Sequence, residues 1–382
     1  MSHIHVQSAD DADSLVEALA HAPRLALDCE AAGFHRYSDR LCLVQITVGD
    51  RTWVVDPLAF DVTPILRAPL ERPDVGVVMH GADFDLRLLS RDLGIRIHGL
   101  VDTQIQASLI GVEGLGLASL LETHFGVTLS KKYQRADWAE RPLTDGMLEY
   151  AADDTRYLER LTDILDGELA RLGRQAWAEE EYLALETISD DPRENGDTRE
   201  DPVVRVKGAR DLPPRQVAAL REALAWRDEI ARRDDRAPFR VIGDPPLIEA
   251  VLGGASGFEA MTAIRGFPRG LAREHGAELV RRLEAVTRIP EPELVGYPRH
   301  VRRGPGRPPP ELEVAVERLK AVRNRRAEEI RLPKGTLMSN ALLLAIARAA
   351  PATMDELLAV EGMRAWKAQV VGDGLLEVTR AL

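Results

Sequence analysis

The chain contains 382 residues, of which 45% are hydrophobic and 29% are charged, and only two are cysteines, Cys29 and Cys42. This length allows two or three domains, and the composition is that of an ordinary soluble globular protein. Two isolated cysteines exclude a disulfide framework and a zinc site with repeated Cys-x-x-Cys spacing. No apolar run reaches the roughly 18 residues of a membrane span, and no secretory leader is expected. We therefore expect a cytoplasmic protein without membrane association.

The net charge of −12 is unevenly distributed along the chain. Residues 1–190 contain 17 Lys and Arg against 33 Asp and Glu, a net charge of −16, whereas residues 191–382 contain 33 against 29, a net charge of +4. An acidic front half and a mildly basic back half fit a metal-dependent head joined to a nucleic-acid-binding tail. The same distribution is compatible with an acidic protein whose tail has no special role.

The first 190 residues alternate between strand and helix patterns, which predicts a mixed α/β domain. Strands are expected at 25–30, 41–48, 52–56 and 75–79. The first three form an antiparallel meander, because short turns connect them, and the fourth is a continuous apolar run typical of a buried parallel strand. Helices are expected at 10–22, 64–70, 83–93, 104–109, 116–126 and 144–171.

The pattern becomes helical after residue 211. Two helical blocks, 212–287 and 311–382, follow a polar linker at 191–211 and are separated by a proline-rich linker at 288–310. Each block opens with a long charged helix and continues through a turn with proline to an apolar helix, which predicts a duplicated all-α domain. The basic stretch at 302–308 is interpreted as a solvated linker.

Two carboxylates end the first predicted strand. Asp28 and Glu30 are two residues apart, so they project to the same face, whereas Cys29 points to the other. Buried neighbouring carboxylates repel each other, and a divalent cation such as Mg²⁺ or Mn²⁺ relieves this repulsion because it prefers hard oxygen ligands. The spacing alone also occurs on solvated faces, so a metal site requires further acids.

Two later segments supply such candidates. Asp85 begins a predicted helix directly after the buried strand, where open α/β sheets place their sites, and Asp83 is expected to cap that helix. Tyr150 and Asp154 are four apart and share one face of a predicted helix. Each segment alone has an ordinary interpretation, either as a favourable charge in a first helical turn or as a surface helix with a buried tyrosine.

Taken together, the motifs resemble those of the tyrosine-bearing branch of the DEDD exonuclease superfamily: Asp28-x-Glu30, Phe84-Asp85 and Tyr150-x-x-x-Asp154. The segment from Lys131 to Trp138, followed by Arg141-Pro142-Leu143, is similar to ribonuclease D. The two helical blocks resemble paired HRDC domains. The resemblance implies a ribonuclease H-like 3′-5′ exonuclease domain over residues 1–190, followed by two HRDC-like domains.

The resemblance also implies two divalent metal ions, Mg²⁺ or Mn²⁺, and the release of 5′-mononucleotides from the 3′ end. By analogy, Asp28 bridges both ions, Glu30 and Asp154 hold the first, and Asp85 reaches the second. Tyr150 orients the attacking water. The expected partner is RNA, in particular tRNA precursors, and no obligate protein partner is expected.

Substrate contacts are expected from one aromatic and several basic residues. Phe34, in the loop 31–40, is placed to stack a terminal base, and four basic residues are candidates for phosphate contacts, namely Lys131, Lys132, Arg135 and Arg141.

Two alternatives remain open. A DNA 3′-5′ exonuclease would use the same site, since no residue here identifies a reader of the 2′-hydroxyl. A nucleic-acid-binding adaptor with an inactive site is disfavoured, because all four acids and the tyrosine are present.

Overall fold

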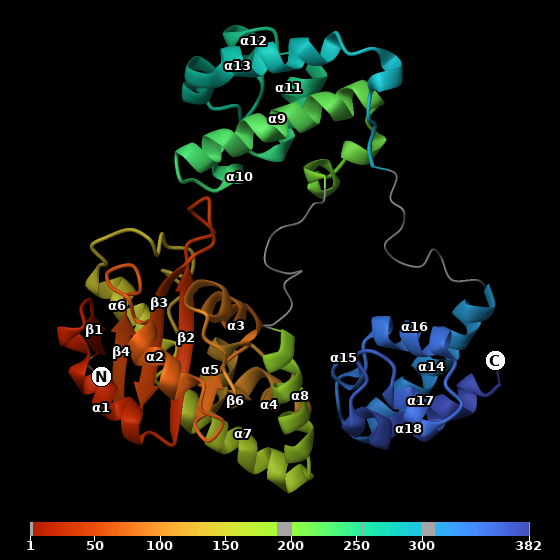
Figure 1. The fold of residues 1–382 in the computed structure, drawn as a ribbon. Coiled ribbons are helices and arrows are strands. Elements are labelled where there is room, and N and C mark those ends of the chain that lie inside the picture. The colour runs from red at the N-terminus through yellow and green to blue at the C-terminus, as the bar shows by residue number, and fades with distance from the viewer. Residues whose placement is uncertain (1–2, 189–200, 254, 299–309, 382) are drawn as a thin grey trace.

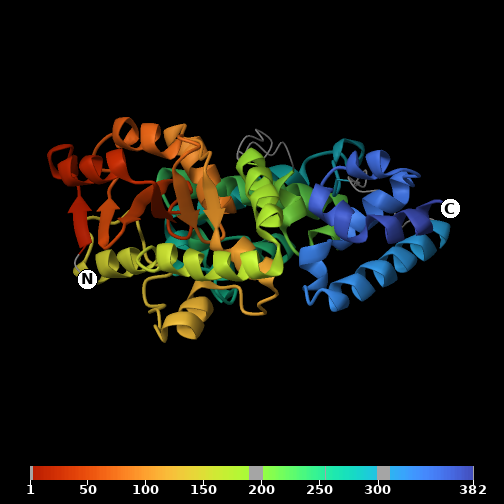
Figure 2. The ribbon, with the colours of Figure 1, turned by 90° about the horizontal axis from the view of Figure 1, so that it is seen from below.

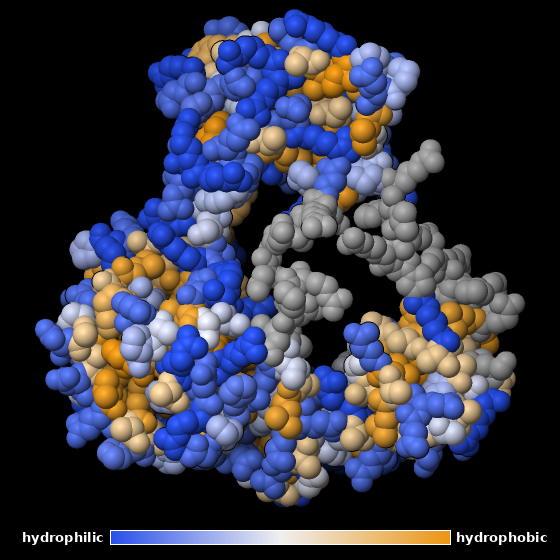
Figure 3. Space-filling view, in the orientation of Figure 1, coloured by the Kyte–Doolittle hydropathy of each residue, from blue (hydrophilic) through white to orange (hydrophobic). Residues whose placement is uncertain are grey.

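The computed structural model describes residues 3–188, 201–253, 255–298 and 310–381. These residues form an N-terminal α/β domain followed by two helical units (Figure 1). None of the helices in these ranges is long and apolar enough to cross a membrane. On the face shown in Figure 3 the surface is largely hydrophilic, and hydrophobic residues form small separate patches.

The α/β domain is built on one six-stranded sheet with the order β1-β4-β3-β2-β5-β6. The strands are β1 (His3–Val6), β2 (Arg24–Ala31), β3 (Leu41–Val48), β4 (Arg51–Val55), β5 (Gly76–Met79) and β6 (Leu100–Asp102). The antiparallel meander β2–β3–β4 and the parallel strand β5 beside β2 confirm the predicted arrangement. The edge strands β1 and β6 were not predicted, because four and three residues are too few to show a strand period.

Helices cover both faces of the sheet (Figures 1 and 2). One face carries α1 (Asp13–His21), α2 (Thr63–Leu70) and α3 (Asp83–Leu88), and the other carries α6 (Asp145–Asp153) and α7 (Leu158–Leu172). Leu25 and Leu27 of β2 are buried against the first group of helices. Since neighbouring strand residues face opposite sides, Asp28 and Glu30 point toward α6.

Several helix boundaries differ from the prediction. The helix expected at 144–171 is two helices, α6 and α7, separated at residues 154–157. Asp83 is the first residue of α3 and not its cap, because Ala82 occupies that position and the Asp83 carboxylate pairs with Arg87 instead. The remaining α-helices in the described part of the domain are α4 (Thr103–Ile110), α5 (Leu117–Phe125) and α8 (Gln175–Ile188), of which α8 was not expected.

The two helical units repeat one order of helices, as predicted. The first contains α9 (Pro214–Arg233), α10 (Pro238–Val241), α11 (Asp244–Gly253), α12 (Phe258–Ala263) and α13 (Arg269–Thr287). The second contains α14 (Pro310–Glu329), α15 (Lys334–Leu337), α16 (Asn340–Ala349), α17 (Met354–Leu358) and α18 (Ala365–Thr379). Val203, Val206 and Ala209, from the segment predicted as a linker, are buried in the core of the first unit. The basic stretch at 302–308 lies outside the described residues.

The second helical unit contacts the α/β domain through α8 (Figures 1 and 2). The rings of Trp177 on α8 and Trp366 on α18 are stacked, with centroids 4.6 Å apart and an interplanar angle of 16°. The Glu180 carboxylate accepts hydrogen bonds from the backbone N–H groups of Ala365 and Trp366, at the start of α18. A carboxylate at a helix N-terminus satisfies free donors and interacts favourably with the helix dipole.

We predict that this stack couples the two parts of the protein. Replacing Trp366, which is 3% exposed, with Ala should lower the free energy of unfolding by about 3–5 kcal/mol, as expected for a large buried aromatic residue. In a double-mutant cycle with Trp177→Ala, measured by urea unfolding, the loss in the double variant should be smaller than the sum of the two single losses by about 0.5–1.5 kcal/mol. Additive losses would show that the rings do not stabilise each other.

Candidate active site

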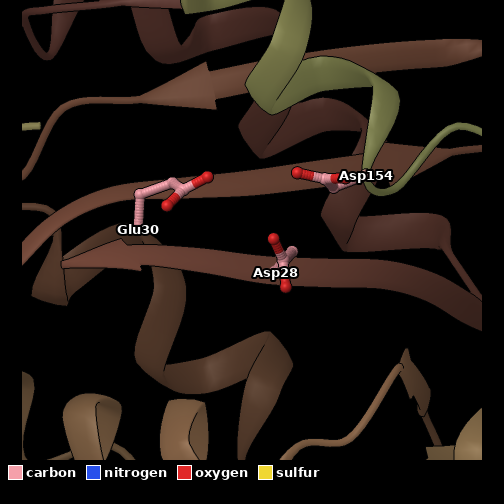
Figure 4. Close-up of side chains that lie close together, drawn as sticks. All are labelled: Asp28, Glu30 and Asp154. Carbon is pink, nitrogen blue, oxygen red and sulfur yellow. The ribbon is translucent and has the colours of Figure 1, made fainter. Parts of the chain in front are cut away.

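Three carboxylates meet on the α6 face of the sheet (Figure 4). One oxygen from each of Asp28, Glu30 and Asp154 lies within 4.8 Å of the other two. Asp28 and Glu30 come from β2, and Asp154 follows the last residue of α6. Side chains more than 120 residues apart in sequence therefore form one oxygen-lined cluster.

Small side chains bring α6 close to the sheet. Ala151 and Ala152 are fully buried against β3 and β4. Just beyond α6, the Thr155 hydroxyl forms a 2.8 Å hydrogen bond with the hydroxyl of Thr47 on β3. Because this bond holds the end of α6 on the sheet, the break between α6 and α7 leaves Asp154 directed at the β2 carboxylates.

Asp85 lies beside this cluster but is not one of the three converging carboxylates. It is in the first turn of α3, past the end of β5, and is 7% exposed. Its charge is close enough to raise the pKa values of Asp28 and Glu30. Asp83, two residues earlier, has a half-exposed side chain paired with Arg87 and takes no part in the cluster.

Burial raises the pKa of each of the four acids. Loss of water raises the pKa values of Asp154 and Asp85 from 3.8 to about 8, and raises those of Asp28 and Glu30 well above their ordinary values. Repulsion from a neighbouring carboxylate adds to the shift in each case. The four groups ionise together near neutral pH only when a cation compensates their charge, and an all-oxygen donor set suits Mg²⁺ or Mn²⁺.

Tyr150 lies on α6 between two aromatic rings. Its ring centroid is 6.2 Å from that of Tyr133, edge to face, and 5.9 Å from that of Trp138. Burial first, and then the charges of Asp154, Glu30 and Asp28, raise the pKa of its hydroxyl. The hydroxyl therefore keeps its proton at neutral pH, which suits it to orient a water molecule rather than to accept a proton.

The residues expected to contact substrate fall into two groups. Phe34, Lys131, Lys132 and Arg135 are exposed, and the Lys132 ammonium group lies 4.9 Å from the centroid of the Tyr133 ring. Arg141, in contrast, donates two hydrogen bonds of 2.6 and 2.8 Å to the buried Asp56 carboxylate and others to backbone carbonyls. We therefore do not retain Arg141 as a phosphate contact, because its donors are used within the protein.

One further residue beside the cluster was not predicted. Gln45 on β3 is the cross-strand partner of Asp28 and is fully buried. Within the described ranges, neither its amide nitrogen nor its oxygen has a hydrogen-bond partner. The signal in the sequence is an amide side chain within the mainly apolar run at 41–48, next to a strand that carries two acids.

The separate parts of the chain match known families. Residues 4–170 match a 3′-5′ exonuclease family, and residues 216–283 and 313–379 each match the HRDC domain. Ribonuclease D of Pseudomonas paraeruginosa is 30% identical over 359 residues, covering 93% of this chain and 91% of that protein. The exosome complex exonuclease RRP6 of Saccharomyces cerevisiae is 33% identical over 264 residues, which are 65% of this chain but only 36% of the yeast protein.

Solved structures agree with these matches. The crystal structure of Escherichia coli RNase D, described as an exoribonuclease involved in structured RNA processing, has a TM-score of 0.67 and 25% identity, covering 100% of this chain and 99% of that one. A protein from Bifidobacterium adolescentis has a TM-score of 0.81 at 25% identity, with 99% and 97% coverage. The same domains in the same order, along nearly the whole length, lead to one conclusion: the chain belongs to the ribonuclease D family of 3′-5′ exoribonucleases.

Proposed function

We propose that this exoribonuclease removes 5′-mononucleotides one at a time from the 3′ ends of structured RNAs such as tRNA precursors. The observation that carries the proposal is the convergence of the Asp28, Glu30 and Asp154 carboxylates, with Asp85 and Tyr150 beside them. We propose that it acts in the cytoplasm. Because the chain carries its own nuclease domain and both helical units, we also propose that it needs no obligate protein partner.

We assign a role to each residue of the cluster. Asp28, Glu30 and Asp154 would hold one divalent cation, Mg²⁺ or Mn²⁺, and Asp28 and Asp85 would hold a second. Such ions, when bound, compensate the charge on the attacking and leaving oxygens of an in-line displacement at phosphorus. The protonated Tyr150 hydroxyl orients the attacking water. The rings of Tyr133 and Trp138 pack against the Tyr150 ring and hold that side chain in place.

The proposal is tested with two substrates, a tRNA extended at its 3′ end and a single-stranded DNA, each with and without Mg²⁺ or Mn²⁺. We expect mononucleotides from the RNA only when metal is present, and none from the Asp28→Asn protein. Asp83→Asn is the matched control, because it also removes a carboxylate near the site, yet Asp83 pairs with Arg87 outside the cluster. Activity in Asp28→Asn would contradict the metal assignment, and faster loss of the DNA would favour a DNA exonuclease.

A second prediction concerns the hydroxyl of Tyr150. Tyr150→Phe keeps the ring and its two aromatic contacts, so the fold and metal affinity should be preserved. Turnover under saturating RNA should fall by roughly 10²–10⁴-fold, the usual size of such catalytic assistance. Metal affinity is measured separately by calorimetric titration with Mn²⁺. An unchanged turnover number would reduce Tyr150 to a packing residue.

The raised pKa values also predict how stability depends on pH. An unfolded Asp side chain ionises near 3.8, whereas Asp154 and Asp85 in the folded protein ionise near 8. Between these values the folded state binds more protons, so the free energy of unfolding falls as pH rises. In EDTA, the melting temperature of the protein should therefore decrease from pH 5 to pH 8 more steeply than that of Asp154→Asn.

Added Mg²⁺ provides the complementary measurement. Because metal binding competes with protonation, the increase in melting temperature on adding Mg²⁺ should be larger at pH 8 than at pH 5. An Mg²⁺ effect that is independent of pH, or the same in Asp154→Asn, would argue against binding at these carboxylates.

A further inference from the structure

A group of aromatic and arginine side chains lies where the first helical unit meets the α/β domain. We name Phe34, Arg135, Phe239 and Arg240 the entrance cluster. The ring centroids of Phe34 and Phe239 are 5.5 Å apart, and the guanidinium groups of Arg240 and Arg135 lie 4.9 and 5.6 Å from the Phe34 centroid. Figure 1 shows the loop between β2 and β3 reaching α10, which carries Phe239 and Arg240. Two domains thus contribute to one cluster.

Other contacts hold this junction together. The Tyr37 hydroxyl donates to the Asp228 carboxylate at 3.0 Å, and the Tyr37 ring packs against the core of the helical unit. The backbone N–H of Ala237 donates to the His35 carbonyl at 3.0 Å. The two phenylalanine rings, in contrast, remain 40% and 52% exposed. Aromatic rings exposed in this way offer flat surfaces on which a base can stack.

The two arginines are available to an anion. Within the described ranges, neither Arg135 nor Arg240 has a carboxylate at ion-pair distance, although the nearby Arg36 is paired with Asp137 at 2.8 Å. Arg240 donates to the Phe34 carbonyl at 2.8 Å through Nε, and a second nitrogen lies 3.2 Å from the His35 ring. The cluster thus adds positive charge to a domain whose sequence is acidic.

Two segments connect the entrance cluster to the carboxylates. Phe34 follows Glu30 by four residues, in the loop that continues β2. Arg135 belongs to the segment whose Tyr133 and Trp138 rings flank Tyr150. When the last phosphate of a nucleic acid strand lies at the carboxylates, the nucleotides that precede it are therefore expected to lie at the entrance cluster.

We propose that the entrance cluster binds the single-stranded 3′ segment of the RNA, with a base on one of the two phenylalanine rings, which are tilted by 56° to each other, and a phosphate near Arg135 and Arg240. Aromatic stacking accepts any base, and arginine supplies both phosphate contacts and cation–π interactions. Bases within a duplex are already stacked on each other, so the cluster selects unpaired 3′ ends. The identity of the ligand as RNA rests on the proposed function, whereas the shared use of two domains rests on the contacts above.

The test measures binding of a 12-nucleotide single-stranded RNA to the full chain in EDTA, where hydrolysis does not interfere. The RNA contains 2-aminopurine, placed at each of several positions from the 3′ end, because its fluorescence is quenched by stacking. We expect the Phe34→Leu/Phe239→Leu protein to bind roughly tenfold or more weakly, the size expected for one stacked base, and to lose quenching at one position.

Phe258→Leu is the matched control. Phe258 is a 37% exposed phenylalanine beneath Arg269 in the same helical unit, but it begins α12, at the far end from the α/β domain (Figure 1). Its RNA affinity should match that of the unaltered protein. Equal losses in the control and the double variant, or wild-type affinity in the double variant, would overturn the proposal.

A second variant separates substrate binding from the domain junction. Arg135→Gln changes a residue of the α/β domain alone, so a loss of RNA affinity without a lower melting temperature points to a direct contact. For one phosphate contact, the slope of log Kd against log salt should decrease by about 0.7. An unchanged slope contradicts the phosphate contact. Hydrolysis of the same RNA by the unaltered protein with Mg²⁺ is assayed separately, so that failure of the proposed function is distinguished from failure of this inference.

Discussion

The repulsion among four carboxylates, one buried and three partly buried, is the constraint on which this structure depends. Without a cation such carboxylates take up protons, as their raised pKa values indicate, while the surrounding scaffold keeps them close together. Two come from one strand, one from the end of a helix on the same face, and one from the first turn of α3. The scaffold thus maintains a site that is unfavourable when empty and favourable when it binds cations.

The position of this site follows from the alternation of side chains along β2 and from the small residues of α6. Alternation along β2 places Leu27 in the core and Asp28 on the opposite face, while the two buried alanines of α6 allow the helix to approach. The hydrogen bond between Thr155 and Thr47 then fixes the end of that helix. The same alternation that builds the core therefore also separates the reactive side chains from it.

Much of this arrangement could be predicted from the sequence because it depends on short-range patterns. The period of two along β2 predicted that Asp28 and Glu30 face the same side, and helical spacing paired Tyr150 with Asp154. Long-range features gave no such signal. The pairing of Arg141 with Asp56 joins segments 85 residues apart. The sequence alone does not distinguish such a paired arginine from an exposed one. The contribution of α10 to the entrance cluster likewise depends on how two domains meet, which no local pattern encodes.

The helical units also change how the whole chain is understood. One docks on α8 through stacked tryptophans, and the other contacts the loop that continues the strand carrying Asp28 and Glu30.

The central claim, however, is that the carboxylates form a divalent-cation site. It is tested most directly by an anomalous difference map from crystals of the protein grown with Mn²⁺. The account predicts two peaks, one on each side of Asp28, with Glu30 and Asp154 beside one and Asp85 facing the other. No peak at these carboxylates, or a strong peak only elsewhere, would contradict it.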